Sequence, residues 1–113
     1  MDSKEQLKLI LEAVDDVKAE NITTLDVSKQ TSSMDNIVIA TGRSEQHVRG
    51  IANNLILEAK RLNLDLIGHE GIDNGLWALI DLSNTIVHVM TEETRELYKL
   101  EKLWSINDSD SED

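Results

Sequence analysis

The aromatic residues of this chain are confined to one stretch near its C-terminus. Trp77, Tyr98 and Trp104 all lie within residues 76–104, and the chain has no phenylalanine. Aromatic side chains carry the largest apolar surfaces and dominate both cores and interfaces. Because a chain of 113 residues has room for only one core, this stretch must supply either a central part of that core or a surface that docks on a partner.

The first half of this stretch predicts a β-hairpin. Residues 76–82 and 85–90 are apolar runs, and the Ser-Asn pair at 83–84 is a turn signal between them. Alternate residues of a strand share one face, so Trp77 and Asp81 should lie together on the first strand. On the second strand, one face should carry Ile86, His88 and Met90.

The second half predicts an amphipathic helix. Thr91 suits the N-cap position, and two glutamates follow it where the helix dipole favours negative charge. Four apolar residues then share one face at helical spacing, namely Leu97, Leu100, Leu103 and Trp104. Tyr98 lies about 100° from that stripe. We therefore expect Trp104 in the core and Tyr98 at the surface.

The N-terminal half alternates between helix and strand patterns. A helix should begin after Asp2 or Ser3, where Ser3 and Gln6 fit a capping box. A short strand is expected at 23–27. Residues 37–41 are an unbroken run of mostly β-branched residues, which is typical of a strand that is covered on both faces.

A helix after Ser44 should pack on that buried strand. Its apolar residues recur at helical spacing, at Val48, Ile51, Ala52, Leu55, Ala59 and Leu62. The order strand, Gly42, Ser44 and helix is typical of the first half of a crossover unit, with the next strand expected at 64–67. The pattern as a whole predicts an α/β domain, with a mixed sheet and flanking helices.

The charge is unevenly distributed. The net charge is −11, and four of these negative charges lie in a Ser/Asp/Glu segment at residues 107–113. That segment has no apolar residues to bury, so we expect a disordered acidic tail after a domain at residues 1–106. The domain keeps a charge of −7. An acidic surface favours solubility or attraction to a basic partner.

Several classes of function are disfavoured. No apolar run has the length of a membrane span, and the N-terminal residues do not form a secretory signal. The eleven basic residues are scattered, so no direct specific recognition of nucleic acid is expected. A cytoplasmic protein without a membrane partner is the default expectation.

The sequence offers no credible catalytic or metal site. Gly42, Arg43 and Ser44 are similar to the strand-to-helix entry of nucleotidyltransferases, whose metals need two carboxylates side by side on a strand. No such pair occurs, since Asp81 is alone on its predicted strand. The three histidines fall in three different elements, and a lone histidine is more often a packing residue than a ligand. No cofactor is expected.

Two readings of Trp77 stay open. It is either a core residue under a helix or part of an exposed sheet face beside carboxylates. The second arrangement is typical of an interface hot spot with an acidic rim. Periodicity does not separate the two.

Short motifs along most of the chain, taken in order, resemble one known family. In the first half they are Leu25-Asp26-Val27, Asp35, Val38-Ile39-Ala40-Thr41-Gly42, Ser44, His47-Val48 and Ile51-Ala52. In the second half they are Glu70-Gly71, Trp77, Leu79, Asp81-Leu82, Val87-His88-Val89-Met90, Glu93, Arg95, Tyr98, Leu100-Glu101 and Leu103-Trp104. Over residues 5–105 the chain is similar to the ribosomal silencing factor family, also called the Iojap family.

The resemblance implies a nucleotidyltransferase-like fold without the catalytic carboxylates, and hence no enzyme. It implies binding to the large ribosomal subunit through an L-fourteen-type ribosomal protein, which would sterically block subunit joining and repress translation. It also implies a homodimer when free, for some members. The alternatives are a factor in large-subunit assembly and a residual nucleotide-binding enzyme.

The resemblance also suggests which residues bind the partner. Trp77 would be an apolar anchor, and Glu70, Asp81 and Glu92 would face basic residues of the ribosomal protein. His88, Met90 and Tyr98 would complete the patch.

Overall fold

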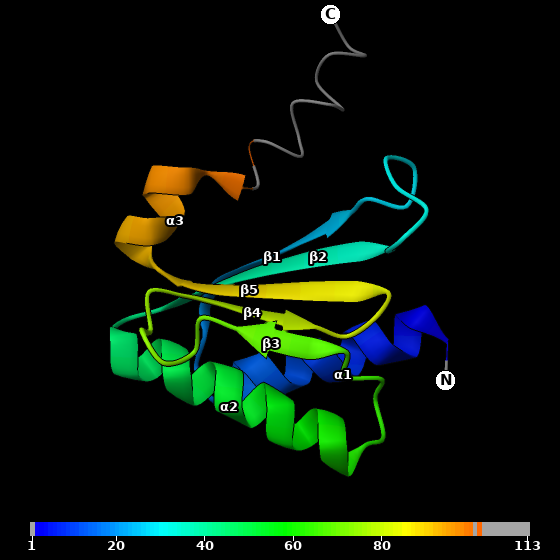
Figure 1. The fold of residues 1–113 in the computed structure, drawn as a ribbon, viewed down its shortest axis with the longest axis horizontal. Coiled ribbons are helices and arrows are strands. Elements are labelled where there is room, and N and C mark those ends of the chain that lie inside the picture. The colour runs from blue at the N-terminus through cyan, green and yellow to red at the C-terminus, as the bar shows by residue number, and fades with distance from the viewer. Residues whose placement is uncertain (1, 101, 103–113) are drawn as a thin grey trace, which may run out of the picture.

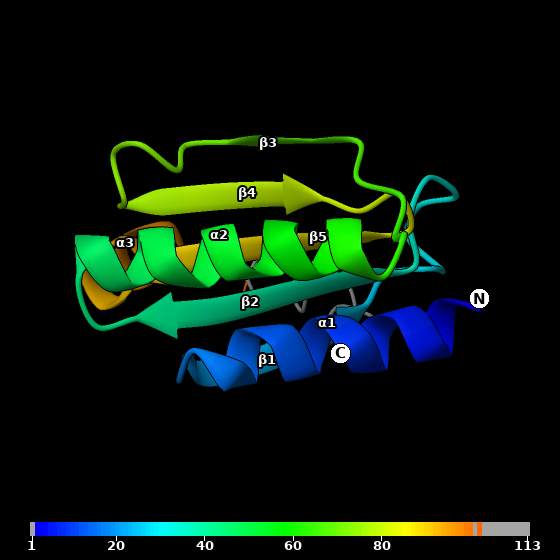
Figure 2. The same ribbon diagram turned by 90° about the horizontal axis from the view of Figure 1, so that it is seen from below.

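A five-stranded mixed sheet carries two long helices on one face and one short helix at the end of the other (Figures 1 and 2). The computed structural model describes residues 2–100 and 102. The helices are α1 (Ser3–Asp16), α2 (Glu45–Arg61) and α3 (Glu92–Tyr98). The strands are β1 (Glu20–Asp26), β2 (Asn36–Gly42), β3 (Gly68–Glu70), β4 (Trp77–Asp81) and β5 (Thr85–Thr91). The α/β prediction is confirmed.

The strand order is β1-β2-β5-β4-β3. The central strand, β5, runs parallel to its neighbour β2, and every other pair is antiparallel. β2 is buried along nearly its whole length, as the unbroken apolar run predicted. The predicted hairpin is also confirmed, because β4 pairs with β5 from Trp77 opposite Met90 to Asp81 opposite Ile86.

The two faces of the sheet are covered differently. On one face, α1 and α2 pack over the main core, which includes Val38, Ile80, Val87 and Val89. The other face carries a smaller cluster, with Ile37, Ile39, Val27 and Met90 at its centre and Trp77 and Leu100 packed against it. α3 stands at one end of this second face (Figure 1).

Hydrogen bonds of buried or half-buried side chains hold the two long helices in place. The backbone N–H of Arg43 donates to Nδ1 of His47 at 2.9 Å, so the ring proton of His47 is on Nε2 and donates to the carbonyl of Val17 at 2.6 Å. Asn54 donates to the carbonyl of Ala13 at 2.9 Å. Both contacts join α2 to the end of α1.

The N-termini of the helices follow the sequence with one correction. Ser44 caps α2 as predicted, and its hydroxyl accepts from the N–H of His47 at 3.0 Å. α1 begins after Asp2, whose carboxylate accepts from the N–H of Glu5 at 2.8 Å. The capping box with Gln6 was wrong, because the Gln6 amide is buried and donates to the carbonyl of Leu82 at 2.9 Å.

The predicted strand at 64–67 was wrong. The chain leaves α2 through Asn63 in the left-handed region, and the N–H of Leu64 donates to the carbonyl of Ala59. Leu64 and Leu66 pack on the main core from a loop. The strand forms only at 68–70, so the parallel neighbour of β2 is β5 and not the next strand in sequence. β1 begins at Glu20, three residues before the predicted strand.

The last helix is shorter than its apolar stripe suggested. α3 ends at Tyr98, and Lys99 adopts the left-handed conformation with φ 50°. Leu97 is 74% exposed, so its assignment to a buried stripe was wrong, whereas the exposure of Tyr98, at 55%, is confirmed. Leu103, Trp104 and the tail expected at 107–113 lie outside the described residues.

Candidate functional site

The face of the sheet opposite α1 and α2 remains partly open over β3, β4 and β5. Cross-strand partners point to the same side of a sheet, and Glu70 is paired with Leu79, Leu79 with His88, and Asp81 with Ile86. Each of these side chains is half-buried or exposed. We call this surface the β3–β5 face. Its members are Glu70, Trp77, Leu79, Asp81, Ile86 and His88.

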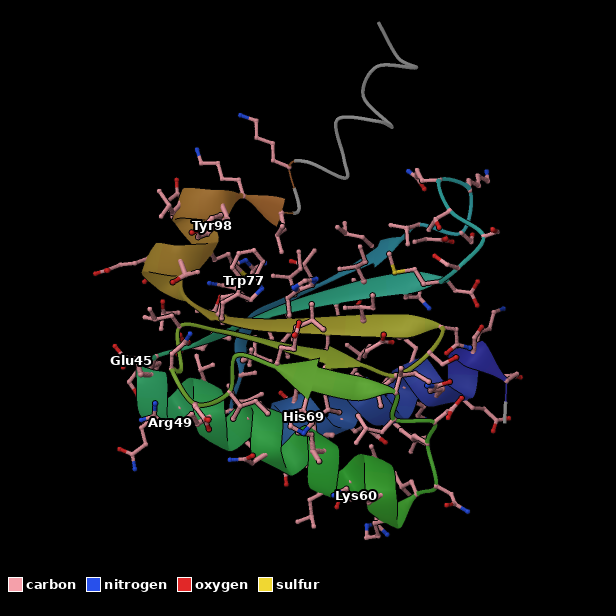
Figure 3. The ribbon with its side chains drawn as sticks, in the orientation of Figure 1. Glu45, Arg49, Lys60, His69, Trp77 and Tyr98 are labelled. Carbon is pink, nitrogen blue, oxygen red and sulfur yellow. The ribbon has the colours of Figure 1, made fainter. Side chains whose placement is uncertain are left out.

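Trp77 lies at the end of this face beside α3 (Figure 3). Its indole is half-buried, and Nε1–H donates to Nδ1 of His88 at 2.9 Å. The ring of Tyr98 lies against it, with centroids 4.8 Å apart and planes tilted by 48°. Trp77 is thus not under either long helix. It stands on the opposite face, and its polar atom is already satisfied within the protein.

His88 lies beside Trp77 in the adjacent strand. The ring centroids of the two residues are 5.9 Å apart. Burial disfavours the charged imidazolium and lowers the pKa of His88 to about 4. The ring is therefore neutral at physiological pH, and Nδ1 is a hydrogen-bond acceptor.

The turns at the two ends of β4 are set by a local hydrogen bond at one end and by a glycine at the other. Oδ1 of Asp81 accepts from the N–H of Ser83 at 3.0 Å, which closes the hairpin turn. Gly71 has a φ of 79°, and a Cβ at this position would collide with the carbonyl oxygen of Trp77. Only glycine allows the end of β3 to pass so close to Trp77.

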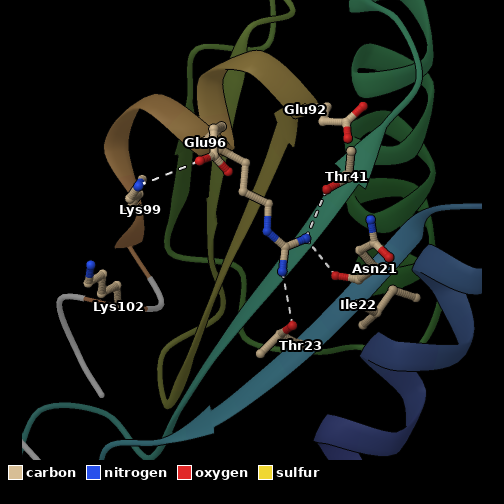
Figure 4. A pocket seen from close by; sticks show the side chains of 9 residues that line it. Asn21, Ile22, Thr23, Thr41, Glu92, Glu96, Lys99 and Lys102 are labelled. Atoms are coloured by element: carbon tan, nitrogen blue, oxygen red, sulfur yellow. Dashed lines mark hydrogen bonds and ion pairs between the residues drawn. The ribbon is translucent and has the colours of Figure 1, made fainter. Parts of the chain in front are cut away.

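The position of α3 over Trp77 depends on Arg95. The guanidinium of Arg95 donates to the carbonyl of Asn21, to Oγ1 of Thr41 at 2.8 Å and to Oγ1 of Thr23 at 2.9 Å. Figure 4 shows these contacts in a groove between α3 and β1. α3 buries none of its own side chains completely, so this arginine is a main attachment of the helix that carries Tyr98.

The structure brings together only part of the predicted site. Trp77, His88 and Tyr98 are in contact, and Asp81 and Glu70 lie on the same face. Met90 is fully buried beneath this region, so its side chain supports Trp77 from the core. Glu92 is exposed, but it lines the groove beside Arg95.

Two residues of the face were missed in the site prediction. Leu79 and Ile86 are half-buried apolar residues on the same side of the sheet, Leu79 between Trp77 and Asp81 on β4 and Ile86 opposite Asp81 on β5. The strand period that placed Trp77 also places both of them. The apolar centre with acidic residues at its edge is the arrangement found at protein interfaces.

The described residues offer neither a metal centre nor a membrane-spanning helix. Within 2–100 and 102, no three His, Asp or Glu side chains are grouped so that they could hold a metal ion. No helix in this part of the chain is long and apolar enough to cross a membrane. The fold and the β3–β5 face define an α/β protein whose most distinctive surface is suited to binding another protein.

Comparisons with known proteins assign the family. A family model described as "Ribosomal silencing factor during starvation" matches residues 1–113. The chain is 38% identical over 104 residues to the ribosomal silencing factor RsfS of Chromobacterium violaceum, covering 92% of this chain and 85% of that protein. The chain belongs to the ribosomal silencing factor (Iojap) family, which is not a family of enzymes.

The structure agrees with this assignment. A crystal structure of a protein from Chromobacterium violaceum matches with a TM-score of 0.91 and 38% identity, covering 93% of this chain and 88% of that one. A more distant relative is "Mitochondrial assembly of ribosomal large subunit protein 1" of Mus musculus, 27% identical over 113 residues, which cover 97% of this chain and 50% of that protein.

The role of Arg95 can be tested by removing it. We expect Arg95→Ala to lower the free energy of unfolding by about 1–3 kcal/mol, since hydrogen bonds from a charged group are lost. Amide hydrogen exchange across 92–98 should accelerate more than in the rest of the sheet. Arg61→Ala is the control, because Arg61 is exposed and its ion pair among the described residues is with Glu58, one turn away on the same helix. Unchanged exchange in α3 would show that other contacts hold this helix.

The pKa of His88 predicts a dependence of stability on pH. Because folding lowers this pKa from 6.5 to about 4, the unfolded chain binds the proton at higher pH. The contribution is fully present above the unfolded pKa and is lost as pH falls towards about 4, by at most roughly 3 kcal/mol. Urea unfolding at several pH values should show this loss in the wild type relative to His88→Gln. A difference that stays constant with pH would contradict the prediction.

Proposed function

We propose that this protein represses translation by binding the large ribosomal subunit and blocking its union with the small subunit. The proposed contact is an L-fourteen-type ribosomal protein, the partner that the family resemblance implies. The observation that supports this proposal most strongly is the half-exposed Trp77 on the β3–β5 face, because tryptophan is enriched among interface hot spots. The bacterial silencing factors among its relatives favour a cytoplasmic site of action.

The chemistry of the face suits a basic ribosomal protein. Leu79 and Ile86 continue the apolar surface of Trp77, and Glu70 and Asp81 add negative charge at its edge. The whole chain carries a net charge of −11. Complementary charge would steer the encounter and make the rate of association fall as salt increases. Glu92 and Tyr98 would contact the partner beyond the end of the sheet.

A role in assembly of the large subunit is the second candidate. It is favoured by the name of the mouse relative, which describes mitochondrial assembly of the ribosomal large subunit. Both candidates require binding to large-subunit particles. Mature subunits would be the preferred target of a repressor, and immature precursors the preferred target of an assembly factor.

Truncation of the anchor tests the contact. We expect Trp77→Ala to weaken binding to isolated large subunits by about 2 kcal/mol or more, roughly 30-fold, as measured by co-sedimentation. Leu57→Ala is the matched control, because Leu57 is a 64%-exposed apolar residue on α2, away from this face. Thermal unfolding of both variants separates lost binding from lost folding. Equal affinity of Trp77→Ala and the wild type would refute the site.

The same face is proposed to pair with a second copy when the protein is free. Apolar surface that is exposed on an unbound protein is often covered by self-association. Light scattering should then show a dimer for the wild type and a monomer for Trp77→Ala. Added large subunits should dissociate the dimer. A wild type that stays monomeric at high concentration would exclude this pairing.

A further inference from the structure

The hydrogen bond between Trp77 and His88 fixes which atoms of the β3–β5 face are offered to a partner. The indole Nε1–H of Trp77 can only donate a hydrogen bond. Nδ1 of His88, which lies 2.9 Å from Nε1, must therefore accept this bond with a lone pair. A neutral imidazole has one proton, and with Nδ1 occupied in this way the proton is on Nε2. The structure therefore assigns the tautomer of His88.

The proton on Nε2 has no acceptor within the protein as described. Among residues 2–100 and 102, the only hydrogen bond of the His88 side chain is the one with Trp77. The ring is half-buried, on the partly open face of β3, β4 and β5. This donor thus remains accessible on the face, next to Leu79 and Ile39 in the neighbouring strands.

We propose that His88 has two roles in docking: its Nδ1 orients Trp77, and its Nε2–H donates a hydrogen bond to an oxygen of the bound protein. This inference rests on the proposed function, since it concerns the same face. It also specifies the partner more closely. The partner must present an apolar surface to the ring of Trp77 and an oxygen acceptor, such as a main-chain carbonyl, to His88.

The arrangement explains why Trp77 can act as an anchor without a polar cost. An indole N–H that becomes buried in an interface without an acceptor loses its hydrogen bond to water. Here the N–H is satisfied before binding, and the ring of Tyr98 limits its motion from the other side. An anchor that is already ordered loses less side-chain entropy when it binds.

Two substitutions separate the two roles. Asparagine places its side-chain oxygen near the position of Nδ1, so His88→Asn can still accept from Trp77 but cannot reach the partner. Glutamine places its amide nitrogen near the position of Nε2, so His88→Gln can reach the partner but leaves the indole without its acceptor. Residue 88 lies on the half-open face, so both polar side chains can be accommodated.

The orientation of Trp77 is measured on the free protein. Nitrogen-15 NMR should show Nδ1 of His88 unprotonated and Nε2 protonated at neutral pH. The indole N–H resonance of Trp77, identified by its loss in Trp77→Phe, should keep its shift in His88→Asn and move in His88→Gln. A proton on Nδ1, or an indole resonance that neither variant moves, would overturn the positioning role.

The donor role is measured by co-sedimentation with isolated large subunits. We expect His88→Asn to weaken binding about five- to tenfold although Trp77 keeps its orientation, because one hydrogen bond to the partner is lost. Binding of His88→Asn at wild-type strength, with Trp77→Ala impaired, would overturn this role alone. A wild type that does not bind would refute the proposed function and the donor role together. The NMR result decides the positioning role in either case.

Discussion

The parallel pairing of β2 with β5 is the interaction on which the rest of the structure depends. The two strands are in register over seven consecutive pairs, from Asn36 opposite Thr85 to Gly42 opposite Thr91. The pairing aligns the ends of both strands, so α2 and α3 begin at the same edge of the sheet. α2 then turns back over one face and α3 rises on the other. A Cβ on Gly42 would lie 2.7 Å from a methyl group of Val48, so this sharp return requires glycine.

This pairing also decides what is available for binding. β1 lies beyond β2 at one edge of the sheet, and the β1–β2 side of the second face is covered by Met34 and Leu100. The β3–β4 side has no equivalent cover among the described residues. The open surface is therefore a consequence of strand order, and β5 divides the covered half of the sheet from the open half.

The features that the sequence predicted well depend on neighbours along the chain. The hairpin of β4 and β5, the faces of Trp77 and Asp81, and the Ser44 cap all follow from spacings of a few residues. The strand expected at 64–67 failed because Leu64 and Leu66 bury their side chains from a loop, and the alternation of a covered loop looks like that of a strand. The predicted capping role of Gln6 failed because the partner of its side chain, the carbonyl of Leu82, is 76 residues away in the chain.

The environment of Trp77 could not be predicted for the same physical reason. Strand alternation leaves both faces of a sheet equivalent until the helices are placed, and that placement follows from the β2–β5 pairing. The cover that Tyr98 provides depends on Arg95, whose acceptors lie 54 to 74 residues earlier in the chain. The sequence could show that Trp77 and His88 lie close together. It could not show that the indole N–H donates to His88. Because of this bond, the half-buried tryptophan offers an apolar surface suited to docking.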